Sequence, residues 1–214
     1  MRANNLSLGS PTMQQILMIE VSPRGKDSAS RAVTETLAAR LFSLHPEAKL
    51  IRRDITAEQL PHLDHTTLRA ITSRDPAEVE RLKAAATLSN ALTDELLASD
   101  LLVISTPMWN FGIPSALKAW IDLVVRPGRT FQYAGAGVDG LAAGKKAILV
   151  LASGGVFSDG PWRPFDFVEP YLRHVLGFIG IIDVVTVRAE GTNVPPLAAN
   201  VVPRANSAVE ALAL

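Results

Sequence analysis

The sequence predicts a single α/β domain, a five-stranded parallel sheet with helices on both faces. Apolar segments of strand length alternate along the 214 residues with longer segments of helical periodicity. Such uninterrupted apolar strands are typical of parallel sheets, because helices cover both faces of the sheet. Three of the strands also end in turns that carry small residues or proline, as strands do where an α/β sheet binds a ligand.

The first half of the chain is expected to hold three strands and two long helices. The strands are expected at residues 15–21, 48–54 and 101–106. Apolar residues recur at spacings of four, four and three over residues 33–44, which predicts a helix with Ser28 at its N-cap. A second helix is expected over residues 76–96, which open on a proline. No element is assigned to residues 55–75, where the pattern is mixed.

The second half of the chain supplies two more strands and three helices. The strands are expected at residues 145–151 and 182–189, and the helices around Leu117 to Val124, over residues 167–178, and over residues 198–212 with a kink at Pro203. Residues 130–141 are typical of a hairpin with a glycine-rich tip. Five strands that alternate with helices are the number found in a flavodoxin-like fold.

Composition argues against several classes of protein. Acidic and basic residues number 21 each, which gives no electrostatic reason to expect nucleic acid or a membrane surface as partner. The absence of cysteine excludes disulfides and thiolate catalysis, and it suits a cytoplasmic protein. No apolar run reaches the roughly 18 residues of a membrane span. Residues 1–13 lack the apolar centre of a signal peptide, so we expect a flexible leader before one domain over residues 14–214.

The loop over residues 22–30 is a candidate phosphate site. It precedes a helix N-terminus, where free N–H groups and the helix dipole attract an anion. Ser22, Ser28 and Ser30 would add hydroxyl donors. Simple helix capping by Ser28 explains the loop about equally well. The loop has neither the Lys-Ser/Thr ending of an ATP-binding loop nor the Gly-x-Gly-x-x-Gly of a dinucleotide turn.

Two further loops suit a flat ring. Asn110 stands among Met108, Trp109 and Phe111, and although aromatic clusters are usually core, an amide in their midst favours contact with the edge of a heterocycle. Residues 152–155 end in two glycines, which let a backbone approach a ligand closely, although they also suit an ordinary turn. One phosphate loop and two ring loops at strand ends together predict flavin mononucleotide (FMN).

The remaining polar residues predict neither a metal site nor a catalytic triad. The four histidines have no spacing that resembles metal ligands. Lys118 and Asp122 lie one helical turn apart and are expected to form a surface ion pair. Residues 159–161 read as a turn. No Ser/His/Asp triad can be recognised in the sequence, so we assign no metal and no catalytic side chain.

The chain resembles the bacterial FMN-dependent NADH-azoreductases, in the flavodoxin-like quinone reductase superfamily. The resemblance runs from residue 16 to the C-terminus, and its Met-x-Asn-Phe segment (108–111) and Leu-Gly-Phe-Ile-Gly segment (176–180) are specific in combination. It implies that FMN is bound by Ser22, Ser28, Ala29, Ser30, Met108, Trp109, Asn110, Phe111, Ala152, Ser153, Gly154 and Gly155. Two positions depart from the family pattern, because Trp109 replaces a frequent tyrosine and Ser153 a familiar arginine.

The resemblance also implies a homodimer with active sites at the subunit interface. Phe131, Tyr133 and Phe167 would wall the substrate pocket. NADH or NADPH would transfer a hydride to flavin N5 and leave, and a quinone or azo compound would then take its place and accept the electrons. Cleavage of an azo bond to two amines would take two such rounds. The alternatives are an NAD(P)H:FMN reductase that releases reduced flavin, a flavodoxin-type electron carrier, and a flavin-free α/β domain.

Overall fold

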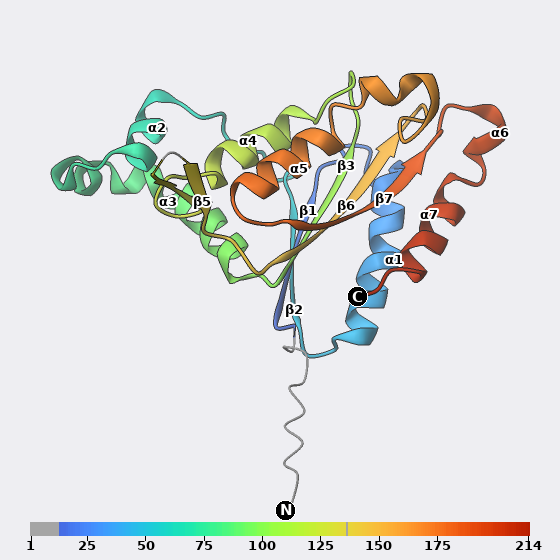
Figure 1. Cartoon of the computed structure of the whole chain (residues 1–214), viewed down its shortest axis with the longest axis horizontal. Coiled ribbons are helices and arrows are strands. Elements are labelled where there is room, and N and C mark those ends of the chain that lie inside the picture. The colour runs from blue at the N-terminus through green and yellow to red at the C-terminus, as the bar shows by residue number, and fades with distance from the viewer. Residues whose placement is uncertain (1–12, 136) are drawn as a thin grey trace, which may run out of the picture.

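A five-stranded parallel sheet lies between two layers of helices in the computed structural model, which describes residues 13–135 and 137–214 (Figure 1). The strands are β1 (Gln15–Glu20), β2 (Lys49–Asp54), β3 (Leu101–Pro107), β6 (Lys146–Ser153) and β7 (Asp183–Glu190). Their order is β2-β1-β3-β6-β7, and every neighbouring pair is parallel. This order confirms the predicted fold class and places the switch in strand order between β1 and β3, where such sheets bind ligands.

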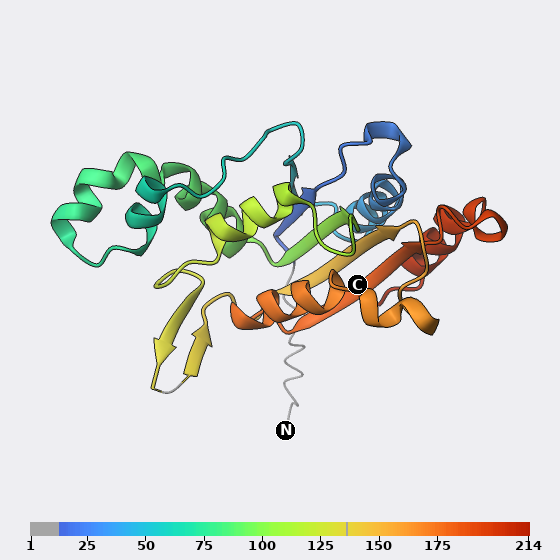
Figure 2. The same ribbon diagram turned by 90° about the horizontal axis from the view of Figure 1, so that it is seen from above.

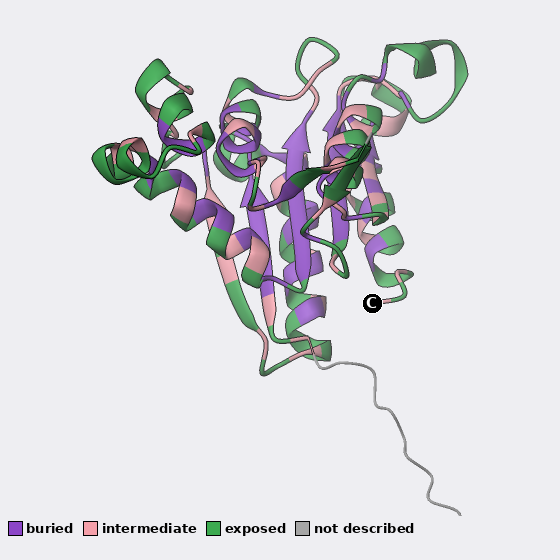
Figure 3. Cartoon of the chain, turned by 60° about the vertical axis from the view of Figure 1, so that its left-hand side comes forward, coloured by how far each residue is buried: buried purple, intermediate pink, exposed green. Residues whose placement is uncertain are grey.

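Helices cover both faces of the sheet. One face carries α1 (Ala29–Leu44) and α7 (Val201–Glu210), and the other carries α3 (Pro76–Ala98), α4 (Ser115–Val124) and α5 (Glu169–Phe178). Residues of β1 alternate between the two cores, because successive strand side chains point to opposite faces. The central strands are therefore buried along their length, whereas the outer faces of the helices are exposed (Figure 3).

Two helical segments differ from the sequence prediction. A helix, α2 (His65–Thr72), forms in the unassigned stretch, and its Ala70 and Ile71 pack against Ala86 of α3. The predicted last helix over residues 198–212 forms as α7, with narrower bounds than expected. A short helix, α6 (Pro195–Ala198), precedes a separate α7, and Pro203 lies in the first turn of α7. An N–H in the first turn has no helical acceptor, so a proline there causes no kink.

The predicted hairpin is confirmed as β4 (Phe131–Ala134) and β5 (Gly137–Gly140), an antiparallel pair inserted between α4 and β6. Figure 2 shows this hairpin apart from the parallel sheet. Gly140 lies so close to the end of α5 that a Cβ there would come within 2.2 Å of the Gly180 nitrogen. Both positions therefore require glycine, Gly180 also for its φ of 99°.

Three smaller predictions concern the surface and the chain ends. Lys118 and Asp122 form the expected ion pair, at 2.5 Å. The expected leader lies outside the described residues except for Met13, which packs against the core under α1 and α7. In the described part of the chain, no helix combines the length and the apolar character that crossing a membrane requires.

Candidate functional site

The three loops that the sequence singles out line one cavity at the carboxyl ends of β1, β3 and β6. This three-loop cavity has a volume of about 170 Å³. The predicted site residues that line this cavity are Ser22, Ser28, Ala29, Met108, Trp109, Ala152, Ser153 and Gly154. Ser30, Asn110, Phe111 and Gly155 do not line it, although each belongs to one of the same loops. Segments more than 120 residues apart in the chain thus meet, because the ends of neighbouring parallel strands share an edge.

The first loop is held by α1 and by Arg31, which does not line the cavity. The Ser28 Oγ accepts a hydrogen bond from the Arg31 backbone N–H at 3.3 Å and lies 3.1 Å from the Ser30 Oγ. The Arg31 guanidinium donates to the Ser22 carbonyl at 2.8 Å and to the Asp54 carboxylate at 2.5 Å. Its charge therefore fixes the loop, and the exposed Arg24 is the cation that lines the cavity.

The second loop is a two-residue turn with an unusual backbone. Trp109 and Gly112 exchange two backbone hydrogen bonds of 3.0 Å, and the residues between them have positive φ, 48° at Asn110 and 68° at Phe111. This is the pattern of a type I′ turn, which Asn-Gly normally forms. Asn110 and Phe111 are the only non-glycine residues with positive φ in the described part of the chain. A side chain in this region costs about 1–2 kcal/mol, least for Asn.

Contacts from the β6–α5 connection offset the strain at Phe111. The Phe167 N–H donates to the Phe111 carbonyl at 3.2 Å, and the Phe111 ring lies 6.2 Å from Phe157 and 6.0 Å from Phe165. Each ring pair contributes about 0.5–1.5 kcal/mol, and the hydrogen bond contributes a similar amount. Together they match or exceed the strain at Phe111 and hold the turn in one shape.

An ion-pair cluster on β7 anchors the β6–α5 connection. Arg188 pairs with Asp166 at 2.6 Å, with Glu190 at 2.8 Å and with Glu169. The Phe157 N–H donates to Glu190 at 2.9 Å. Burial opposes the charge on Arg188, but the hydrogen bonds to its carboxylate partners outweigh burial and raise its pKa. The connection that supports the strained turn is thus fixed to the sheet by the ion pairs of Arg188.

The third loop packs against a fourth loop that the sequence reasoning missed. A Cβ at Gly154 would lie 2.6 Å from the Asn193 Nδ2, and the Asn193 N–H donates to the Gly154 carbonyl at 3.0 Å. Thr192 and Asn193 line the cavity as well. They follow β7, so the rule that ligands bind at the carboxyl ends of strands could have identified them.

The three predicted pocket walls lie outside the three-loop cavity of a single chain. Phe131 is buried in the hairpin, 4.7 Å from the ring of Phe178, and Tyr133 lies 5.5 Å from Phe131 with its side chain exposed. Phe167 is exposed beside the second loop. Their role as walls of a substrate pocket stays a prediction.

The donors of the three-loop cavity fit part of an FMN molecule. Hydroxyls, Arg24 and the start of α1 suit a phosphate, while Met108 and Trp109 with the glycine backbone suit a ring. The volume lies below the roughly 300–1,000 Å³ of common ligand pockets. A bound flavin would therefore extend beyond the cavity, where a second molecule can reach its ring.

The fold and these loops define a flavodoxin-like protein, and the family described as "Flavodoxin-like fold" matches residues 14–212. An FMN-dependent NADH:quinone oxidoreductase of Beijerinckia indica subsp. indica is 72% identical over 202 residues, which cover 94% of this chain and 100% of that protein. An FMN-dependent NADH:quinone oxidoreductase of Pseudomonas fluorescens is 45% identical and covers 85% of this chain and 89% of that protein. The chain therefore belongs to the family of FMN-dependent NADH:quinone oxidoreductases.

Solved structures confirm the resemblance to azoreductases. An azoreductase from Bacillus anthracis Sterne matches with a TM-score of 0.81 at 27% identity, over 92% of this chain and 97% of that one. An FMN-dependent NADH-azoreductase from Bacillus anthracis Ames Ancestor, solved in complex with FMN, matches with a TM-score of 0.77 at 25% identity. That match covers 94% of this chain and 100% of the other.

Proposed function

We propose that this chain binds FMN in the three-loop cavity and uses it to pass electrons from NADH to quinones and azo compounds. The observation that carries the proposal is the meeting of one phosphate-type loop and two ring-type loops around one cavity. Relatives named as FMN-dependent NADH:quinone oxidoreductases, and a similar azoreductase solved with FMN, support it.

The residues of the three-loop cavity divide the cofactor between them. The hydroxyls of Ser22 and Ser28, the charge of Arg24 and the N-terminus of α1 hold the phosphate. Asn110 lies in the second loop outside the cavity, and its amide meets the polar edge of the ring where the flavin extends beyond the cavity. Backbone N–H groups at residues 152–155 stabilise negative charge on the ring. Bound FMN supplies two-electron transfer through N5. No side chain is needed as an acid or base.

Donor and acceptor use the same open face of the bound ring in turn. Trp109 and Phe111 are 45% and 43% exposed, which leaves room for one flat molecule beside the turn. Initial rates measured with NADH and benzoquinone at several concentrations of each should give parallel double-reciprocal lines. Intersecting lines would contradict the proposal that NADH and the quinone bind in turn at the same face of the flavin. With methyl red as acceptor, two NADH should be consumed for each azo bond cleaved.

Retention of FMN separates this proposal from a reductase that releases reduced flavin. The FMN-loaded protein should keep its yellow colour through gel filtration, both as isolated and after turnover with NADH and benzoquinone. Loss of flavin to the small-molecule fraction after turnover would favour the releasing reductase instead.

We further propose a cytoplasmic homodimer. A cavity of about 340 Å³ lies between α2, α4 and α5, and its lining is mostly apolar. Leu68 on α2 is 44% exposed at this cavity. Burial of such a surface against a second copy is favourable. A second copy could also bring the exposed Tyr133 of one hairpin toward the other subunit's site.

A further inference from the structure

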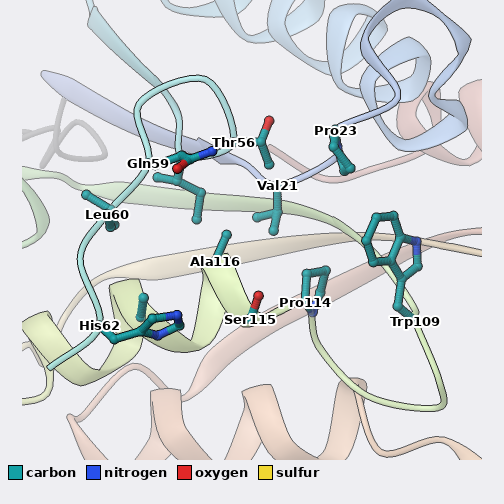
Figure 4. Close-up of a pocket in the computed structure, with 12 residues that line it drawn as sticks. Val21, Pro23, Thr56, Gln59, Leu60, His62, Trp109, Pro114, Ser115 and Ala116 are labelled. Carbon is teal, nitrogen blue, oxygen red and sulfur yellow. The ribbon is translucent and has the colours of Figure 1, made fainter.

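A second cavity, of about 300 Å³, opens beside the three-loop cavity at the same edge of the sheet. We call it the α4 cavity, because Ser115, Ala116 and Ala119 of α4 line it together with Ile55 and Gln59 of the β2–α2 loop. Figure 4 shows these segments around an open space, with Trp109 at one end and His62 at the other. It is separate from the three-loop cavity and from the apolar cavity between α2, α4 and α5.

The lining of the α4 cavity suits an uncharged flat ring with a hydrogen-bonding edge. Val21, Ile55 and Ala116 give it apolar walls, and no aspartate, glutamate, lysine or arginine among the described residues lines it. Polar groups come from Thr56, Gln59, Ser115 and His62. The indole of Trp109 offers a face for stacking. A glutamine amide both donates and accepts, which matches the paired amino group and ring nitrogen of adenine.

The position of Trp109 indicates which part of a ligand the α4 cavity receives. Trp109 lines both cavities, so a ring in the α4 cavity lies across the indole from the flavin site. Such a ring would belong to a ligand with two ring systems. One ring system reacts at the flavin, and the other, in the α4 cavity, does not react. Pro23 lines the α4 cavity and its neighbour Arg24 lines the three-loop cavity, so the two cavities adjoin along the first loop as well.

We propose that the α4 cavity binds the adenosine half of NADH, with Gln59 at the adenine edge and Trp109 against its face. The inference rests on the proposed function, because it assumes that the nicotinamide meets FMN in the three-loop cavity. It assigns part of the affinity for NADH to Gln59, which lies outside the three flavin loops.

Two substrates and one fragment test the α4 cavity. Reduced nicotinamide mononucleotide lacks the adenosine half, so the FMN-loaded wild type should show a higher kcat/KM with NADH than with this mononucleotide. Gln59→Leu should lower that ratio roughly tenfold, and Ala116→Leu, which fills the cavity, should bring it near one. Glu58→Leu, at the exposed neighbouring position, is the matched control and should leave the ratio unchanged.

ADP binding gives a readout that does not depend on turnover. Calorimetry should show ADP binding to FMN-loaded protein, and Gln59→Leu should weaken this binding roughly tenfold. Equal kcat/KM for the two donors, or ADP binding that Gln59→Leu leaves unchanged, would overturn the proposal. If Gln59→Leu or Ala116→Leu dissociated a dimer but left the ratio of the two kcat/KM values unchanged, a second subunit would fill the cavity instead. Oxidation of neither donor would count against the proposed function, whereas ADP binding would still report on the cavity.

Discussion

At the scale of single residues, Asn110 and Phe111 show why the second loop is more than a connector. A type I′ turn is usually made by Asn-Gly, without a bulky side chain in the left-handed region. This chain keeps a phenylalanine there and supports it through Phe157, Phe165 and Phe167. Backbone strain that the surroundings hold in place is typical of binding sites. We infer that the turn is rigid so that Asn110 presents its amide to the ring.

Replacing Asn110 by glycine isolates the contribution of that amide. Glycine adopts positive φ without strain, so Asn110→Gly keeps the turn and removes only the amide group. Loss of one hydrogen bond to the flavin should raise the Kd for FMN roughly three- to tenfold, measured by quenching of flavin fluorescence. An unchanged Kd would remove Asn110 from the cofactor site. A melting temperature close to that of the wild type serves as the check on folding.

A pair of substitutions at Ser28 separates helix capping from phosphate binding. Aspartate and asparagine are both good N-caps, so Ser28→Asp and Ser28→Asn should leave the apoprotein about as stable as the wild type. Only aspartate would repel a phosphate, and at low salt it should weaken FMN binding at least tenfold. Equal FMN affinity in the two variants would place the phosphate elsewhere. FMN binding by the two variants should be measured at low and at high salt, because salt screens the repulsion between the aspartate and the phosphate. The difference in FMN affinity should therefore be smaller at high salt.

At the scale of elements, the strands were predictable because their signal is local. The apolar runs of β1, β3 and β6 need no tertiary information, and the ends of parallel strands meet by geometry. The helix α2 was missed because it has eight residues and depends on packing against α3. A kink was predicted at Pro203 because the last helix was expected to begin earlier, at residue 198, which placed this proline in its interior.

The candidate site was predictable to the same extent. Its loops follow strands and could be read from the sequence, but the left-handed turn could not, because Asn-Phe carries no type I′ signal. The Arg188 cluster was also invisible, since it joins β7 to Asp166 and Glu169 through side-chain geometry. Thr192 and Asn193 were within reach of the strand-end rule and were overlooked.

The Arg188 cluster predicts a specific loss of stability in acid. Burial opposes ionisation of Glu169, but hydrogen bonds from Thr186, Arg173 and Arg188 outweigh burial and hold its pKa below the ordinary 4.5. A carboxyl whose folded pKa is lowered stabilises the protein above its unfolded pKa and loses that effect as pH falls through the folded value. Urea unfolding between pH 6 and pH 3 should therefore show a smaller loss on acidification in Glu169→Gln than in the wild type. An equal loss in both proteins would contradict this role for Glu169.

At the scale of the whole molecule, one edge of the sheet carries both cavities, while α2, α4 and α5 surround an apolar cavity beside the hairpin. The sheet supplies a platform, and the loops after its strands line the cavities. The apolar surface suits a second copy of the chain, in keeping with the proposed homodimer. Binding sites and assembly would then lie on neighbouring surfaces.

A charge placed on that apolar surface should separate the subunits. Leu68→Glu would put a carboxylate into the interface, and sedimentation velocity at micromolar concentration should then show a monomer in place of a dimer. Phe42→Glu is the matched control, because Phe42 is 63% exposed on α1 at the other face of the sheet. A dimer that survives Leu68→Glu would place the interface elsewhere.

The most direct test of the central claim is an anaerobic spectral titration of the FMN-loaded, desalted protein. About one equivalent of NADH should bleach the bound flavin's visible absorption, and benzoquinone should restore it while the flavin stays with the protein. That cycle is the behaviour of an FMN-dependent NADH:quinone oxidoreductase. Bound flavin that NADH does not bleach would favour an electron carrier, and protein that retains no flavin would contradict the assignment of the three-loop cavity.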